Sequence, residues 1–231
     1  MDEKWVPVLS ESLLFAGIAP NTLKAMLVCL QPQVHSYHKN SYIAMMGESF
    51  AGVGILLSGK APVIKESVTG KRVVISMLQT GDLFGEMAAF SSRKVWPASV
   101  YAKTDCRVLF LPVDKMVESC SHNCGGHRAL IYNMLRIISD RAVMLNRRIE
   151  YFSMKSLREK ISTYLLEQYQ WCGKEIFELP LNRSELSGFL NVSRESLSRE
   201  MCRMRDEGSI DFYQSSVRIK NLAALKETAE G

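Results

Sequence analysis

The chain has 231 residues, of which 47% are hydrophobic and 23% are charged, and its formal net charge is +5 at pH 7. This balance is ordinary for a globular protein and excludes an intrinsically disordered chain. The length fits two modest domains better than a single small one. The positive charge is compatible with a polyanionic partner but does not require one.

The N-terminal segment gives no sign of a targeting sequence. Residues 1–10 include Asp2 and Glu3 and lack a long apolar core, so no signal peptide is expected. No apolar stretch approaches the length of a membrane span. The six cysteines show no repeating frame, and without a signal peptide they predict reduced thiols. We therefore expect a cytoplasmic protein that does not contact a membrane.

Between about residues 36 and 112, short β-rich runs alternate with glycines. The runs are Gly54–Leu57, Val63–Lys65, Val73–Leu78 and Arg107–Leu111. Short strands separated by turn signals predict an all-β sandwich or barrel. The pair at 69–70, Thr-Gly, predicts a hairpin turn between the second and third runs.

After Pro112 the pattern changes to helix, and a second helix is expected from near Ser153 to about Trp171. The first helical stretch carries a heptad seam. Apolar residues recur at alternating steps of four and three for three repeats, with charged flanks, which favours pairing with a partner helix. Additional apolar residues widen the stripe, so we expect the helix to pack on its own barrel as well. A core-facing helix with no partner is the alternative. The candidate dimer-interface residues are Ile131, Leu135, Ile138, Ala142, Leu145, Ile149 and Phe152.

The segment Leu181–Ile210 has the spacing of a helix-turn-helix. Asn182 and Glu185 fit a capping box, which predicts that a helix begins there. Asn191 tolerates the left-handed conformation that a tight turn between helices needs. Ser193 is a good N-cap for the second helix.

The second helix of this segment has an apolar face and a polar N-terminal end. Leu197, Met201 and Met204 fall on one face at steps of four and three. A helix-turn-helix presents the start of its second helix to the major groove of double-stranded DNA. Arginine can donate two hydrogen bonds to guanine, and serines at the helix start can meet phosphate. The candidate DNA-binding residues are Arg194, Glu195, Ser198, Arg199, Ser193 and Ser196.

A hairpin is expected after this helix. Ser209–Tyr213 and Val217–Lys220, joined by 214–216, are typical of a wing. The alternative for the whole segment is a solvated, salt-bridged helix in an ordinary α-domain. Residues 153–231 contain equal numbers of acidic and basic side chains, so a DNA-binding surface must come from local placement of charge.

Taken together, residues 10–222 resemble the CRP/FNR family of bacterial regulators. The resemblance rests on Gly59 with the preceding Leu-Leu pair, on Gly81–Met87, on the long helix and on Val192–Arg199. It implies an α+β chain with a double-stranded β-helix (jelly-roll) sensor domain at 1–128, a dimerisation helix at 129–153 and a winged helix-turn-helix at 154–231. It also implies a homodimer that binds a palindromic DNA site with TGA-like half-site cores and contacts RNA polymerase.

The resemblance leaves two patterns open for the base-reading residues. Arg194, Glu195 and Arg199 match the pattern of cyclic-AMP receptors in this family. Glu195, Ser198 and Arg199 match the FNR-like pattern. Because the sequence satisfies both, the half-site stays open at this point.

The sensor domain departs from the cyclic-AMP pattern. Gly85 and Glu86 match positions that meet the ribose, but the Arg-Ser pair that holds the cyclic phosphate in the family aligns, without gaps, with Trp96 and Pro97. Arg93 and Lys94 lie nearby, but a small slip of the alignment would be needed to use them. Losing a charge-assisted clamp removes most affinity for an anion, so we predict that cyclic AMP is not the effector. The adenine-contacting pair aligns with a Leu-Asn pair on the long helix. The candidate residues for an unknown small-molecule effector are Gly85, Glu86, Met87, Trp96, Pro97, Leu145 and Asn146.

The sequence also offers residues for other sensing chemistries. A metal or iron–sulfur cluster could use the group Cys120, His122, Cys124 and His127, and haem could use His35 or His38. We favour no metal, because the cysteine spacing is not that of structural zinc and a cluster needs four ligands. The phosphate-binding loop, nucleophile elbow and zinc-protease motif of common enzymes are absent from the sequence. A stand-alone cyclic-nucleotide module is disfavoured by the helix-turn-helix.

Overall fold

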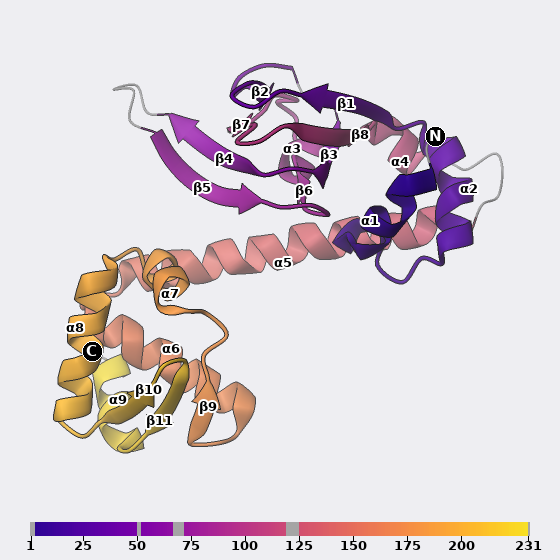
Figure 1. The fold of residues 1–231 in the computed structure, drawn as a ribbon. Helices are drawn as coiled ribbons and strands as arrows, with labels where there is room; N and C mark the ends of the chain where they lie inside the picture. The colour runs from indigo at the N-terminus through magenta and orange to yellow at the C-terminus, as the bar shows by residue number, and fades with distance from the viewer. Residues whose placement is uncertain (1–2, 50–51, 67–71, 119–124, 231) are drawn as a thin grey trace. The chain divides into compact units, whose positions relative to one another are not determined.

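The structure, a computed structural model, describes residues 3–49, 52–66, 72–118 and 125–230. The chain divides into two compact units, Met1–Arg141 and Ala142–Gly231. Figure 1 shows strands gathered in the first unit and mainly helices in the second. The predicted α+β class, with strands followed by helices, is confirmed.

The first unit is built from two four-stranded antiparallel sheets and short helices. The sheets have the strand orders β1-β8-β3-β6 and β2-β7-β4-β5. The strands are β1 (Gln33–Tyr37), β2 (Tyr42–Ala44), β3 (Val53–Ser58), β4 (Ala61–Glu66), β5 (Arg72–Leu78), β6 (Leu83–Phe84), β7 (Ser99–Tyr101) and β8 (Cys106–Leu111). The helical segments are η1 (Glu3–Trp5), α1 (Val6–Glu11), η2 (Leu13–Phe15), α2 (Pro20–Leu30), α3 (Glu86–Ala89) and α4 (Val113–Val117).

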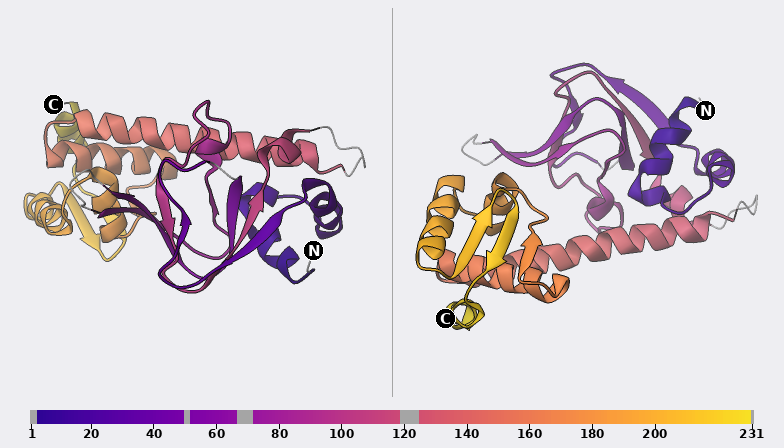
Figure 2. Two further views of the ribbon diagram at one scale, coloured as in Figure 1. Left: turned by 90° about the horizontal axis from the view of Figure 1, so that it is seen from above. Right: turned by 60° about the horizontal axis from the view of Figure 1, so that its bottom comes forward.

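The two sheets curl around a common interior, as the left view of Figure 2 shows. This interior is filled by aliphatic side chains from both sheets and by the aromatic rings of Phe84, Trp96 and Phe110. The four predicted runs correspond to β3, β4, β5 and β8, which confirms the predicted β-sandwich domain. The predicted Thr-Gly turn lies outside the described residues.

Helix α5 (His127–Ser153) is one continuous helix of 27 residues. Leu130, Met134 and Ile137 are buried in the core of the first unit, together with side chains of α1 and α2. The expectation that this helix packs on its own domain is therefore confirmed. All seven candidate dimer-interface residues are exposed or half-buried in the single chain. Two of them also line an apolar cavity of about 160 Å³, formed by Phe90, Met116, Val117, Leu130, Ile131, Met134 and Leu135.

The second unit packs four helices around a small sheet. Its elements after α5 are α6 (Leu157–Cys172), β9 (Ile176–Glu178), α7 (Arg183–Leu190), α8 (Arg194–Asp206), β10 (Ile210–Tyr213), β11 (Ser216–Ile219) and α9 (Leu222–Glu230). The sheet is antiparallel with the order β10-β11-β9, and the right view of Figure 2 shows it beside α8. A helix was expected from about Ser153, but α6 begins at Leu157. Ser156 and Glu159 form a capping box there, which fixes the start of the helix.

In the described part of the chain, no helix is long and apolar enough to cross a lipid bilayer.

Candidate nucleic-acid interface and sensor core

Local hydrogen bonds fix the start of α7. The Asn182 side chain accepts from the backbone N–H groups of Ser184 and Glu185 at 2.9 and 3.0 Å. The Glu185 carboxylate accepts from the backbone N–H of Asn182 at 2.8 Å. The capping box predicted from the sequence is thus confirmed, and it satisfies donors that a helix start would otherwise leave unpaired.

The turn between α7 and α8 follows from two polar residues. Asn191 closes α7 in the left-handed region, with φ of 55°. Ser193 then caps α8, its Oγ accepting from the backbone N–H of Ser196 at 3.1 Å. Both roles were predicted. Because Leu190 and Leu197 on either side of the turn are fully buried, the two helices are held together by the core of the second unit.

Helix α8 has one buried face and one polar face. Leu197, Met201 and Met204 are buried, as predicted. Among the candidate DNA-binding residues, Ser193, Arg194, Glu195 and Arg199 are exposed, and Ser196 and Ser198 are half-buried. The first two turns of α8 therefore present polar side chains to a partner.

Ion pairs neutralise the arginines around the C-terminal part of α8. Arg158 of α6 donates to Glu200 at 2.6 Å and to Glu207 at 2.9 Å. This contact with Arg158 lowers the pKa of the Glu207 carboxyl. Arg203 also donates to Glu200, at 3.4 Å.

The first turns of α8 differ in their charge pairing. Among the described residues, Arg194 and Arg199 have no carboxylate partner, and Arg199 makes only a long contact of 3.5 Å with the Ser196 hydroxyl. Although acidic and basic residues balance over residues 153–231, two arginines without a carboxylate partner, Arg194 and Arg199, thus lie in the first two turns of α8. This is the local placement of charge that a DNA-binding surface needs.

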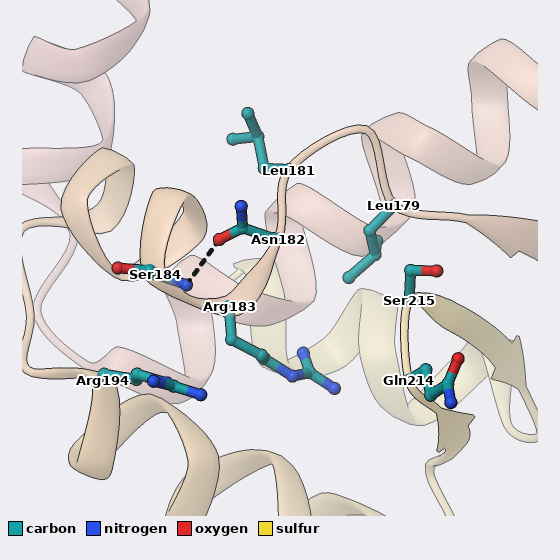
Figure 3. A pocket seen from close by; sticks show the side chains of 8 residues that line it. All are labelled: Leu179, Leu181, Asn182, Arg183, Ser184, Arg194, Gln214 and Ser215. Atoms are coloured by element: carbon teal, nitrogen blue, oxygen red, sulfur yellow. Dashed lines mark hydrogen bonds between the residues drawn. The ribbon is translucent and has the colours of Figure 1, made fainter. Parts of the chain in front are cut away.

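A pocket of about 370 Å³ lies between the starts of α7 and α8 and the turn of the β10–β11 hairpin. Figure 3 shows Arg183 and Arg194 on its helix side and Gln214 and Ser215 on the opposite side. No acidic residue lines it. The lining residues are Leu179, Leu181, Asn182, Arg183, Ser184, Arg194, Gln214 and Ser215.

Arg183 is the residue of this pocket that the sequence analysis missed. Its guanidinium lies 4.7 Å from the centre of the Phe212 ring and donates to the sulfur of Met201. Burial lowers its pKa, and its Nη2 atom is buried without a hydrogen-bond partner. Its position directly after the N-cap Asn182 placed it at the start of a helix. The sequence did not indicate that Phe212 of the wing would lie against it.

The predicted wing is present. Strands β10 and β11 pair antiparallel, with Tyr213 opposite Ser216, so the connection is the two-residue turn Gln214–Ser215. A three-residue connection was expected, and Ser216 instead begins β11. Gln214 adopts a φ of 54°, which lets so short a turn reverse the chain. Tyr213, beside the turn, is 76% exposed.

In the sensor domain, the candidate residues Gly85 and Glu86 begin α3. Gly85 has a φ of 83°, which favours glycine. Glu86 is only 2% exposed; its Oε1 pairs with the guanidinium of Arg141, and its Oε2 is buried without a partner. Arg141 was also missed from the sequence, because it follows Glu86 by 55 positions. Met87 is exposed.

Trp96 lies in the aromatic core of the barrel. It is 5% exposed, and its ring centre lies 5.9 Å from that of Phe84 and 6.5 Å from that of Phe110. Pro97 is exposed. Leu145 and Asn146 are exposed residues of α5 in the second unit. Glu86 and Trp96 thus lie in the first unit, whereas Leu145 and Asn146 belong to the second unit.

Of the residues considered for a metal or haem, only His35, His38 and His127 lie in the described chain. Cys120, His122 and Cys124 lie outside the described residues, whereas His127 begins α5. His35 and His38 are both exposed, in the middle of β1 and just past its end. Over the ranges that the structure describes, no three His, Cys, Asp or Glu side chains are grouped to hold a metal ion.

Two family models match the chain, one in each unit. The model described as "Cyclic nucleotide-binding domain" matches residues 34–123, and the model described as "Crp-like helix-turn-helix domain" matches residues 159–228. The first covers the sheets of the sensor domain, and the second covers α6 to α9.

Curated relatives are similar along most of the chain. A protein of Thermus thermophilus named "Cyclic AMP receptor protein" is 24% identical over 95% of this chain and 98% of its own length. A protein of Cereibacter sphaeroides named "Transcriptional activator protein FnrL" is 25% identical over 84% of this chain and 79% of its own length.

A solved structure shares the fold. The structure of the Thermus thermophilus Catabolite Activator Protein matches with a TM-score of 0.54 and 23% identity, over 95% of this chain and 99% of that chain. The two matched domains, their order and these relatives agree with the β-sandwich, the long helix and the winged helix-turn-helix described above. The chain therefore belongs to the CRP/FNR family of DNA-binding transcription regulators, which are transcription factors and not enzymes.

Proposed function

We propose that the protein is a homodimeric, effector-responsive regulator that reads a palindromic DNA site with TGA-like half-site cores. The observation that carries this proposal is the polar face at the start of α8, where Glu195 and Arg199 are exposed without an ion-pair partner among the described residues. Arginine recognises guanine with two hydrogen bonds, and glutamate accepts from the cytosine amino group. The N-cap Ser193 and the first-turn residue Ser196 lie at a helix start, where phosphate can bind.

The homodimer is inferred from the seam on α5. Its seven residues keep a heptad spacing and are not buried in the single chain, and such a stripe is stabilised by a second helix. Two copies supply two α8 helices, which read two half-sites about 34 Å apart. The contact with RNA polymerase is inferred from membership of the family alone.

The DNA proposal is tested by selecting binding sites from a library of random duplexes with the full chain. We expect an inverted repeat with a TGA-like core in each half. Replacing Arg199 with Ala should cost about 1–3 kcal/mol of binding and relax the preference at one base pair. Lys226→Ala on α9, an exposed position away from α8, is the matched control and should leave the selected site unchanged. A site with unaltered preference after Arg199→Ala would contradict the assigned register.

We further propose that the effector is not cyclic AMP, although relatives carry that ligand in their names. The proposal is supported by Trp96, whose ring packs with Phe84 and Phe110 at a position where the family uses a phosphate clamp. Indole supplies one neutral donor, and Pro97 has no N–H. Calorimetric titration of the full chain with cyclic AMP should give no binding heat. Binding at micromolar concentration would overturn the proposal, because Trp96 would then not prevent the phosphate from binding.

A further inference from the structure

We propose that Arg194 binds a DNA backbone phosphate in the pocket between α7, α8 and the wing, and that Glu195, Ser198 and Arg199 alone read the bases. This inference rests on the proposed DNA binding, and it refines the role of one of its candidate residues. It also decides between the two base-reading patterns that the sequence satisfies, in favour of the one that does not use Arg194.

The direction of Arg194 about the helix axis is the first argument. Residues of an α-helix are turned by about 100° each, so Arg194 lies only about 20° from Met201. Met201 is fully buried. By the same geometry Glu195 and Arg199 lie about 120° and 160° from Met201. Glu195 and Arg199 therefore face away from the core, whereas Arg194 leaves the helix beside the buried face.

The surroundings of Arg194 are the second argument. It lines the pocket together with Arg183 of α7 and the wing-turn residues Gln214 and Ser215, as Figure 3 shows. Two guanidinium groups and no acidic side chain line this space. Among the described residues neither arginine has a carboxylate partner. The pocket is thus suited to an anion, because its lining includes side-chain donors from α7, α8 and the wing turn.

The burial of Arg183 without a carboxylate partner is the third argument. A half-buried guanidinium without a carboxylate partner is costly for a folded protein, and the Nη2 atom of Arg183 is buried without an acceptor. A phosphate held by Arg194 in the adjoining space would compensate this charge through space. Phe212 of β10 stacks on Arg183 at 4.7 Å, so the wing holds the charge at the pocket wall.

The experiment measures binding of the full chain to the selected duplex and to a scrambled duplex over a range of salt concentrations. Arg194→Ala should weaken binding to both duplexes by the same factor, roughly tenfold at 0.1 M salt, and reduce the slope of log K against log salt by about 1. The base preference selected from the random library should be unchanged. Arg194→Lys should restore affinity and slope, because a lysine ammonium also neutralises a phosphate.

Arg199 provides the matched comparison on the same helix. Arg199→Ala and Arg199→Lys should both lose the preference at one base pair, because a lysine cannot reproduce the bidentate contact of arginine with guanine in the same geometry. A changed base preference in Arg194→Ala would overturn the inference, as would an unchanged affinity and salt slope. If the unmodified protein binds no duplex in a salt-dependent manner, the proposed function itself fails, and this assignment fails with it.

Discussion

Among single residues, Glu86 is a buried carboxylate whose charge is compensated by an ion pair. Its carboxylate is almost completely buried, and the guanidinium of Arg141 is the ion-pair partner of Oε1. A buried carboxylate is tolerated only when its charge is compensated. Arg141 comes from the middle of α5, so this pair fastens the long helix to the start of α3.

Removing Arg141 should therefore destabilise the sensor domain. We expect Arg141→Met to lower its free energy of unfolding by about 3 kcal/mol, because the buried charge of Glu86 loses its partner. The double variant with Glu86→Gln should recover most of that loss. Urea unfolding followed by tryptophan fluorescence measures both. Equal destabilisation by the single and double variants would contradict the charge explanation.

Two tyrosines of the second unit should make its free energy of unfolding fall at alkaline pH. Burial raises the pKa of Tyr164 to about 12, and burial with a hydrogen bond to Glu167 raises the pKa of Tyr151. Because both folded pKa values exceed the unfolded value near 10, the stabilisation is complete below pH 10. It is lost as the pH rises, since only the unfolded chain releases these protons.

We expect the free energy of unfolding to fall more steeply above pH 10 in the unmodified protein than in Tyr151→Phe. The variant removes one titrating group while keeping the ring against Phe189, which lies 5.0 Å away. Tyr213→Phe, at a side chain that is 76% exposed, is the control for removing a phenol outside the core. Denaturant midpoints at pH 8 and pH 11 distinguish these outcomes, and identical dependence in all three proteins would refute the assignment.

At the scale of elements, close packing between β3 and β6 limits the size of the side chain at position 54. A Cβ atom built on Gly54 would lie 2.3 Å from the Phe84 ring, which belongs to β6. Gly188 in α7 has open space around it. Close packing therefore requires a glycine at position 54, whereas the space around Gly188 does not require one.

Gly54→Ala should destabilise the sensor domain by about 1–3 kcal/mol, because the added methyl group overpacks the barrel core. Gly188→Ala should instead stabilise the helix-turn-helix by up to about 1 kcal/mol, because alanine favours the helix interior. Thermal unfolding of both variants provides the test. A neutral Gly54→Ala would mean that Phe84 can move aside.

For the molecule as a whole, the proposed homodimer depends on the seam of α5. Ile149 is 63% exposed in the single chain. Ile149→Glu should convert the protein to a monomer, because a charge in a heptad seam is desolvated when the helices pair. Light scattering after gel filtration measures the mass. Glu150→Lys, next to the seam, should stay dimeric, and a dimeric Ile149→Glu would move the interface elsewhere.

Local elements were predictable because their determinants lie close together in the sequence. The capping box at Asn182 and the N-cap at Ser193 involve residues only three positions apart, so spacing alone identifies them. The sandwich strands followed from short apolar runs and turn residues. The start of α6 was misplaced because the apolar pattern continues through Met154, while the Ser156 cap interrupts the helix.

The sequence by itself determined the strand-rich domain, the long amphipathic helix and the helix-turn-helix, because periodicity and capping act over a few residues. Only the tertiary structure decided that Trp96 fills the barrel core, that Arg141 partners Glu86 and that Arg183 lies beneath the wing. These contacts join residues far apart in the chain, and their energies depend on burial. Burial exists only once the elements have packed.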